Sequence, residues 1–155
     1  MAPKYDRGEL AEPLESSAID RLHRHSGFML RRAVQRSTST FAEHCKPVTT
    51  TQYGALVILS ERDGISQKEL GDLLFLDRTT TAVAVSKLDE KGLIIRRRDK
   101  ADARRMVLSL SKAGTLAVPK LNRRALEAQD NLLENLTDAE KVTLDKLLCK
   151  LVGQP

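Results

Sequence analysis

Residues 96–105 carry an unusual concentration of positive charge. The segment holds two carboxylates, Asp99 and Asp102, and six cations: Arg96, Arg97, Arg98, Lys100, Arg104 and Arg105. Six positive and two negative charges leave +4, which is most of the formal net charge of +5 carried by the 155-residue chain. A localised excess of this kind can bind a polyanion, whereas an evenly spread excess affects mainly solubility. A solvated basic loop without a partner is the alternative interpretation.

Patterns for catalysis or metal binding are missing from the sequence. It contains no glycine-rich phosphate loop, no HExxH and no GxSxG, and its three histidines offer few groups for acid–base chemistry. His23 and His25 fall about 200° apart around an expected helix, so they cannot readily share a metal ion. The basic segment contains no aromatic residue on which single-stranded RNA could stack. We therefore expect no enzyme, no metal and no cofactor.

Cysteine usage and hydropathy indicate a cytoplasmic protein. Cys45 and Cys149 are far apart in the sequence and have no metal-type spacing, so two reduced thiols are expected. The first 17 residues lack the apolar core of a secretion signal, and no run of about 18 apolar residues marks a membrane span. We expect a single domain over residues 1–155 and no membrane partner.

Helix starts can be located from capping residues. In a capping box, a Ser or Thr and a Glu or Gln three residues later satisfy the free amides of a first helical turn. Three pairs have this spacing: Thr49–Gln52, Ser66–Glu69 and Thr137–Glu140. They predict helices over 50–62, 66–74 and 137–152. Asp77 can cap a further helix, which ends at Gly92 where a left-handed C-cap is expected.

The other elements follow from periodicity. Residues 17–44 have apolar positions at mostly helical spacing and predict one long first helix. Residues 111–133 predict another helix, bent at Pro119. The β-prone runs 93–95 and 106–110 predict a hairpin with the charged segment at its tip. The expected fold is mainly α with a small β-hairpin wing.

Two short helices joined by a short turn, before and after Asp77, form a helix-turn-helix. With the hairpin they predict a winged helix-turn-helix plus a helical dimerisation region. The winged helix-turn-helix DNA-binding region covers 47–110, and the dimerisation region covers 17–46 and 111–152. Because the terminal helices have more apolar positions than one small core can cover, a second copy of the chain is the expected partner.

The helix after Asp77 has two different faces. At about 100° per residue, one face is expected to pack inward and collects Asp77, Thr80, Thr81, Ala84 and Leu88, with Val85 at its margin. The opposite face has small and hydroxyl-bearing side chains, which let a helix enter a major groove and contact base edges. It carries Arg78, Thr79, Ala82, Val83, Ser86 and Lys87. A strand is the alternative, because β-branched residues are poor helix formers, but the cap and the glycine stop oppose it.

The wing is expected to add contacts beside the recognition helix. Arg104 and Arg105 at the hairpin tip could reach the minor groove or its phosphates, and Asp102 is expected to orient the Arg104 guanidinium group. The complete predicted set of DNA-binding residues is Ser66, Gln67, Lys68, Arg78, Thr79, Thr80, Thr81, Ala82, Val83, Ser86, Lys87, Arg98, Lys100, Asp102, Arg104 and Arg105.

These motifs resemble those of the MarR family of bacterial winged-helix regulators. The resemblance covers about residues 20–152 and is carried by "VTTTQYGALVIL", "ISQKELGDLLFLDRTTTAVAVSKLDEKGLIIRRRDKADARRMVLSLSKAG" and "LTDAEKVTLDKLLCKL". Its most specific parts are Asp102-x-Arg104, Leu-Ser-Leu-Ser-x-x-Gly at 108–114 and Lys-Gly-Leu-Ile at 91–94. The resemblance implies a homodimer, joined through its first and last helices, that represses transcription from a pseudo-palindromic operator. It also implies release of DNA by a small ligand bound between the dimerisation and DNA-binding parts. The commoner family helix has a Thr-Arg pair where this sequence has Ala82 and Val83.

A candidate ligand site lies near the start of the chain. His23, Ser26 and Gly27 occupy adjoining positions of the expected first helix, and Tyr53 could approach from the next. Gly27 costs a helix about 1 kcal/mol relative to Ala, which close packing or a bound ligand explains. The expected effector is a small aromatic or heteroaromatic acid, or its thioester. Two alternatives are a solvated His23 with Gly27 at a helix crossing, and a thiol-based redox-sensing regulator of the same fold that uses Cys45.

Overall fold

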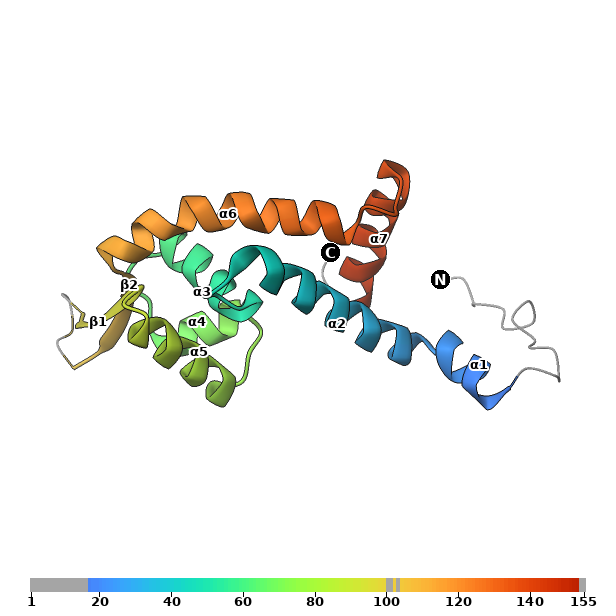
Figure 1. Ribbon diagram of the computed structural model, residues 1–155. Helices are drawn as coiled ribbons and strands as arrows, with labels where there is room; N and C mark the ends of the chain where they lie inside the picture. Colours follow the sequence, from blue (N-terminus) through green and yellow to red (C-terminus); the bar gives the residue numbers. More distant parts are fainter. Residues whose placement is uncertain (1–16, 100–101, 103, 154–155) are drawn as a thin grey trace. The chain divides into compact units, whose positions relative to one another are not determined.

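The computed structural model describes residues 17–99, 102 and 104–153 (Figure 1). The chain divides into two compact units, residues 1–36 and residues 37–155. Among the described helices, none combines the length and the apolar character needed to cross a lipid bilayer.

The first unit contains α1 (Ala18–Arg24) and the start of α2 (Ser26–Cys45). α1 begins at a capping box between Ser17 and Asp20 that the sequence analysis did not identify. The prediction of one long helix over residues 17–44 is wrong at His25, whose backbone is extended (φ −67°, ψ 122°) and separates the two helices. The first helix is therefore two helices with a bend between them.

The second unit contains the remaining helices and a hairpin. They are α3 (Thr50–Glu61), α4 (Gln67–Leu73), α5 (Arg78–Glu90), β1 (Ile94–Arg98), β2 (Met106–Leu110), α6 (Lys112–Leu132) and α7 (Asp138–Leu151). All three predicted capping boxes are present, at the starts of α3, α4 and α7. Pro119 lies inside α6 without ending it. The predicted fold class, mainly α with a β-hairpin wing, is confirmed.

The two ends of α5 are fixed by the residues predicted to fix them. At the start, the Thr80 backbone N–H donates to Asp77 Oδ1 at 2.8 Å. At the end, Gly92 has φ +66°. Leu93 N donates to Leu88 O (3.0 Å) and Gly92 N to Asp89 O (2.8 Å), which is the bonding pattern of a Schellman motif. The start and the end of α5 are therefore both defined by local hydrogen bonds.

The hairpin is joined to the helix-turn-helix through backbone contacts. β1 and β2 are antiparallel, with Ile94 opposite Leu110 and Arg98 opposite Met106. An isolated bridge pairs Ile65 with Leu108, so β2 is also bonded to the segment that precedes α4. The prediction that the whole charged segment forms the tip is wrong, because Arg96, Arg97 and Arg98 belong to β1.

The core of the second unit is formed by side chains from the end of α2, from α3, α4, α5 and α6, and from the hairpin. Its largest fully buried apolar side chains are Leu56, Leu59, Leu70, Leu88, Ile94, Val85 and Val107. Figure 1 shows α6 running alongside α3, and the two helices are in contact. A Cβ on Gly114 would lie 2.0 Å from the Leu93 carbonyl oxygen, so only glycine allows the start of α6 to approach the hairpin this closely. The same core thus holds the wing and the recognition helix in place.

Candidate nucleic-acid interface

The outward face of α5 is available to a ligand the size of DNA. Arg78, Thr79, Ser86 and Lys87 are exposed, and Val83 is 57% exposed. Ala82, between them, is half-buried. These are the small and hydroxyl-bearing residues predicted for this face, joined by two cations. Between Arg78 and Lys87 the side chains of this face are small, so the backbone of the helix can come close to the bases of a major groove.

The two neighbouring threonines at the start of α5 differ in burial: Thr81 packs inward as its helical position predicts, and Thr80 does not. Thr81 is only 2% exposed, and its hydroxyl donates to the Asp77 carbonyl oxygen at 2.8 Å. It is therefore withdrawn from the surface that a base could reach, and its inclusion among the DNA-binding residues is corrected. Thr80, predicted to pack inward, is exposed, and its hydroxyl donates to Asp77 Oδ2 at 2.7 Å. Hydrogen bonds from Thr80 lower the pKa of Asp77.

The start of α4 lies next to the wing. Ser66 is the N-cap, and its hydroxyl donates to Glu69 Oε2 at 2.6 Å. Gln67 is half-buried, and the exposed Lys68 pairs with Asp72 at 3.8 Å. The Ser66 hydroxyl is thus used in capping the helix. Of the three residues predicted here to bind DNA, Lys68 is the one that exposes a charge to solvent.

Three of the wing cations are paired with carboxylates from other elements. Arg96 Nε lies 3.1 Å from Asp89 Oδ2 at the end of α5. Arg97 Nη2 lies 3.0 Å from Asp63 Oδ2, and its Nε donates to Ser109 Oγ at 2.9 Å. Arg105 pairs with Glu69. The charges of these three arginines are therefore balanced within the protein.

Arg104 differs from these three residues. It is exposed and, among the residues that the structure describes, takes part in none of the ion pairs that hold Arg96, Arg97 and Arg105. Asp102 accepts a hydrogen bond from the Arg104 backbone N–H at 3.0 Å. The Asp102 carboxylate thus contributes to the turn, and its orientation of the Arg104 guanidinium group stays a prediction.

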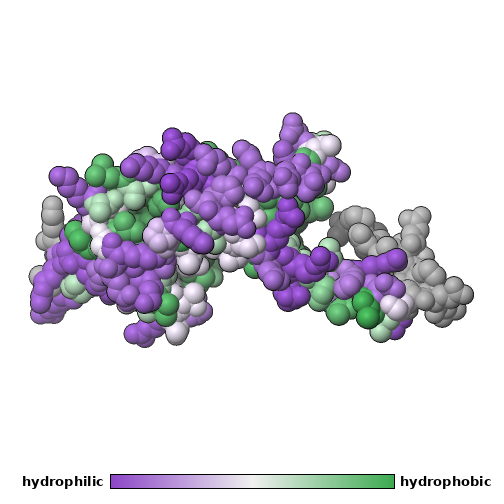
Figure 2. Space-filling model, in the orientation of Figure 1, coloured by the Kyte–Doolittle hydropathy of each residue, from purple (hydrophilic) through white to green (hydrophobic). Residues whose placement is uncertain are grey.

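Of the other two predicted wing contacts, only Arg98 belongs to the described residues. Arg98 is exposed at the end of β1. Lys100 lies outside the described residues. Figure 2 shows hydrophilic residues gathered over the hairpin end of the second unit, in agreement with the exposed positions of Arg98 and Arg104.

Glu69 connects the wing to the helix-turn-helix. Its carboxylate accepts hydrogen bonds from the Ser66 hydroxyl and from the Ser66 backbone N–H, and it also pairs with Arg105. The hydrogen bonds from Ser66, followed by that from Arg105, lower the pKa of Glu69 to about 2. A single carboxylate therefore caps α4 and positions one arginine of the hairpin.

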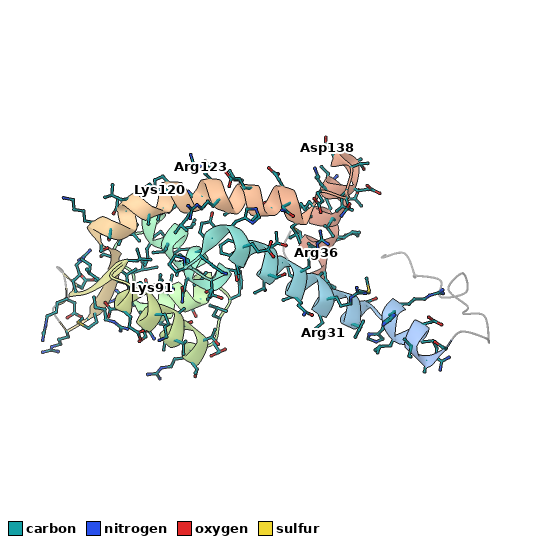
Figure 3. The ribbon with its side chains drawn as sticks, in the orientation of Figure 1. Arg31, Arg36, Lys91, Lys120, Arg123 and Asp138 are labelled. Carbon is teal, nitrogen blue, oxygen red and sulfur yellow. The ribbon has the colours of Figure 1, made fainter. Side chains whose placement is uncertain are left out.

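Lys91, at the end of α5, has a structural role. Its Nζ donates to Gln52 Oε1 at 2.7 Å and to the Pro47 carbonyl oxygen. Figure 3 labels Lys91 where α5 gives way to β1, and it labels Lys120 and Arg123 on α6. Because its charge is held against the start of α3, Lys91 joins two helices of the core.

The residues predicted to bind the effector belong to both units. In the first unit, the His23 ring stacks on Phe28 with centroids 5.6 Å apart. A Cβ on Gly27 would lie 3.3 Å from two atoms of the His25 ring. Because that ring is exposed, a shift of a few tenths of an ångström would make room for the Cβ, and packing does not require glycine here. Ser26 is exposed. In the second unit, the Tyr53 hydroxyl donates to Asn122 Oδ1 at 3.1 Å.

Cys45 lies at the end of α2 and is fully buried. Burial raises the pKa of its thiol, and the nearby Arg124 opposes this only in part. Cys149 is half-buried on α7. A raised pKa reduces the thiolate fraction at neutral pH, and the thiolate is the form that reacts with oxidants.

The carboxylates that pair with the wing were not predicted from the sequence. Asp89 lies 7 residues from its arginine, Asp63 lies 34 residues away and Glu69 lies 36 residues away. No local spacing rule relates residues so far apart. The sequence feature that singled out Glu69 was its capping box with Ser66. This feature predicted a helix start and did not indicate the ion pair with Arg105.

Residues 46–105 match the model of the MarR family. The fold is similar to that of a transcriptional regulator from Pseudomonas aeruginosa, with a TM-score of 0.81 and 39% identity over 84% of this chain and 99% of that chain. It is also similar to the PcaV transcriptional regulator from Streptomyces coelicolor in complex with its natural ligand, with a TM-score of 0.79 and 29% identity over 89% of this chain and 98% of that chain. A transcriptional regulatory protein for the hcr operon of Thauera aromatica is 31% identical over 152 residues, which is 94% of this chain and 87% of the relative.

Proposed function

The chain belongs to the MarR family of transcriptional regulators, and we propose that it is a homodimeric, sequence-specific DNA-binding repressor of a pseudo-palindromic operator. A small aromatic or heteroaromatic acid, or its thioester, releases it from that operator. It acts in the cytoplasm, where a bacterial chromosome is accessible.

One observation carries the DNA-binding part of this proposal. The helix α5 is fixed at both ends by Asp77 and Gly92 while its face with Arg78, Thr79 and Val83 remains exposed. A rigid helix with small outward side chains can enter the major groove and read base edges. The exposure of Arg104 on the adjoining hairpin supports a contact with phosphates or with the neighbouring minor groove.

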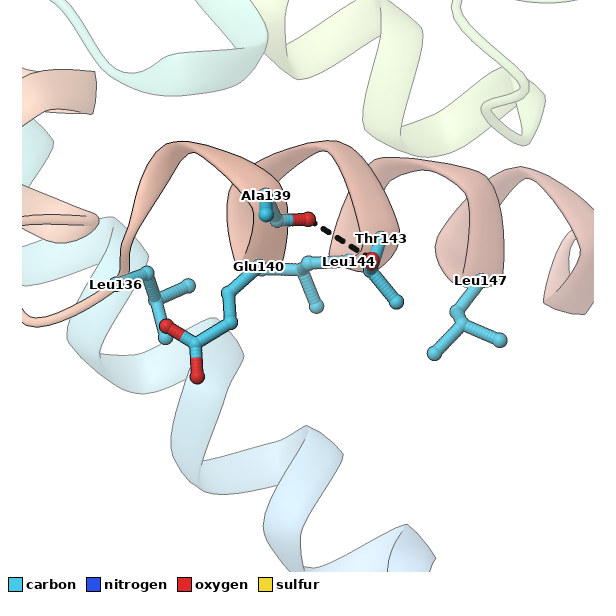
Figure 4. Close-up of a pocket in the computed structure, with 6 residues that line it drawn as sticks. All are labelled: Leu136, Ala139, Glu140, Thr143, Leu144 and Leu147. Atoms are coloured by element: carbon cyan, nitrogen blue, oxygen red, sulfur yellow. Dashed lines mark hydrogen bonds between the residues drawn. The ribbon is translucent and has the colours of Figure 1, made fainter.

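Exposed apolar surface on α7 supports the homodimer. Leu147, Leu151 and Val152 are each about 60% exposed or more. A shallow apolar hollow on the same helix is lined by Leu136, Ala139, Glu140, Thr143, Leu144 and Leu147 (Figure 4). An apolar helix face of this kind marks an interaction site, and a second copy of the chain provides a matching face under two-fold symmetry.

For the effector, the proposal keeps the predicted residues, which are His23, Ser26 and Gly27 of the first unit and Tyr53 of the second. In the first unit, an imidazole and a hydroxyl provide hydrogen-bonding groups for an acid. In the second unit, the phenol of Tyr53 provides a flat surface for an aromatic ring. The PcaV relative, at 29% identity, is a regulator with a natural ligand, which supports regulation of this chain by a small molecule.

The thiol-based alternative receives no support from Cys45. A fully buried thiol with a raised pKa is a poor target for peroxide, because oxidation follows thiolate character and exposure. The proposal therefore gives Cys45 a packing role.

DNA binding is tested by selecting duplexes from a random library with the purified full-length protein at fixed salt. We expect enrichment of one inverted repeat, bound at least a thousandfold more tightly than a scrambled duplex. Recovery of unrelated sequences with equal affinity would refute sequence-specific binding.

The effector is then tested on that enriched duplex. Aromatic and heteroaromatic acids and their thioesters are screened by thermal shift, and those that bind are assayed for release of DNA. A releasing compound must bind the DNA-free form more tightly than the DNA-bound form. We expect His23→Ala to abolish the response while DNA binding persists. An intact response in this variant would show that the effector site lies elsewhere.

A further inference from the structure

The turn between α4 and α5 contains Phe75, a residue whose type is explained neither by its helix-capping position nor by its packing. The last residue in helical conformation after α4 is Leu74, and Phe75 follows with φ +54°. Leu76 N donates to Gly71 O at 3.0 Å, and Phe75 N donates to Asp72 O at 3.2 Å. These bonds define a Schellman motif in which Phe75 occupies the left-handed C′ position.

A left-handed position of this type normally holds glycine, because a Cβ in this conformation crowds the following carbonyl group. The same chain follows this rule elsewhere: Gly92 after α5 has φ +66°, and Gly153 after α7 has φ +73°. Phe75 is the one non-glycine residue with positive φ among those the structure describes. The backbone of the turn would therefore be more favourable with glycine at position 75.

Packing does not compensate for this cost. The Phe75 side chain is 83% exposed, the most exposed of the large apolar side chains in the described part of the chain. The core of the second unit does not include it, whereas the flanking Leu74 packs against that core. An aromatic ring that strains its backbone and remains in water destabilises the free protein, and such features are retained where they contact a partner.

Position in the fold identifies that partner. Phe75 lies two residues before the N-cap Asp77 and three before Arg78, where the outward face of α5 begins. The two Schellman bonds hold the turn rigidly beside the start of this helix. If α5 enters the major groove, the turn that precedes it lies at the edge of the groove, next to the sugars and phosphates of one strand.

From this geometry we infer that Phe75 is a DNA-contacting residue, whose ring packs against deoxyribose or a thymine methyl group at the edge of the major groove. This inference rests on the DNA-binding function proposed above. Aromatic side chains contact thymine methyl groups favourably, and an uncharged contact of this kind releases no counterions. Phe75 thus contributes to affinity without contributing to salt dependence.

The test uses full-length protein and the enriched duplex, with three variants. Phe75→Gly and Phe75→Asn remove the ring and keep residues that tolerate the left-handed backbone. Phe75→Tyr retains the ring as the matched control. Melting temperature, operator affinity and the slope of affinity against salt are measured for each.

We expect Phe75→Gly and Phe75→Asn to melt at or above the temperature of the wild type and to bind about tenfold more weakly with an unchanged salt slope. Phe75→Tyr should bind within about twofold of the wild type. Wild-type affinity in both ring-free variants, or an equal loss in the tyrosine variant, would overturn the inference and leave the proposed function standing. A lower melting temperature in both ring-free variants would overturn it as well, because the ring would then have a stabilising role. Absence of specific DNA binding by the wild-type protein would refute the proposed function and this inference together.

Discussion

Replacing Arg104 with alanine should weaken operator binding and should also make the affinity less dependent on salt concentration. Arg104 is exposed, while Arg96, Arg97 and Arg105 are paired with carboxylates of the protein. A cation that is already balanced gains little by approaching a phosphate. Among these four arginines, Arg104 should therefore be the one that displaces counterions from DNA.

The size of the effect follows from the number of contacts. Each phosphate contact contributes about −0.9 to the slope of log K against log salt, and a dimer carries two copies of Arg104, so the slope should become less steep by about 1.8. Between about 50 and 200 mM salt, the wild type should then lose about twelvefold more affinity than Arg104→Ala.

Fluorescence anisotropy with the labelled operator duplex, repeated across this salt range, measures both slopes. The matched control is the double variant Arg96→Ala with Asp89→Ala, which removes one charge of each sign from an ion pair of 3.1 Å. This variant should keep the wild-type slope. An unchanged slope in Arg104→Ala, or an equal reduction in the control, would show that ion pairing within the wing does not decide which arginine contacts DNA.

Three further predictions concern the recognition helix and its support. Val83→Ser should change the preferred base at particular operator positions by about 1–3 kcal/mol, as measured with single-substitution duplexes; equal weakening on every sequence would contradict it. Asp77→Ala should lower the urea concentration at the midpoint of unfolding, because the Thr80 N–H loses its cap; an unchanged midpoint would show that the cap is dispensable. Because the folded-state pKa of Glu69 is lowered from 4.5 to about 2, its stabilising contribution is complete above pH 4.5 and is lost as the pH falls toward 2. The stability advantage of the wild type over Glu69→Gln should therefore shrink across this acid range, and a constant difference would mean that the carboxylate charge does not matter.

The local elements of this fold were predictable because their determinants are close together in the sequence. The capping boxes at Thr49, Ser66 and Thr137 and the glycine stop at Gly92 each depend on residues within one helical turn. The same holds for the outward face of α5, which follows from helical periodicity once Asp77 fixes the start.

What could not be predicted depends on residues that are distant in the sequence or on backbone geometry. The break at His25 has no proline or glycine at the position itself, and helical periodicity passes through it. The ion pair between Arg105 and Glu69 joins the wing to α4 only after folding. The left-handed conformation of Phe75 follows from the Schellman bonds of the turn, whereas the sequence there contains no glycine to indicate it.

In the proposed function, two copies of α5 read the two halves of one operator. Hydroxyl-radical footprinting of the full-length protein on the enriched duplex tests this claim. A two-fold symmetric protein should protect two equivalent half-sites whose centres lie about 10 bp, or a multiple of that spacing, apart on the same face of the duplex. Protection of a single unsymmetrical site by one copy of the chain would contradict it.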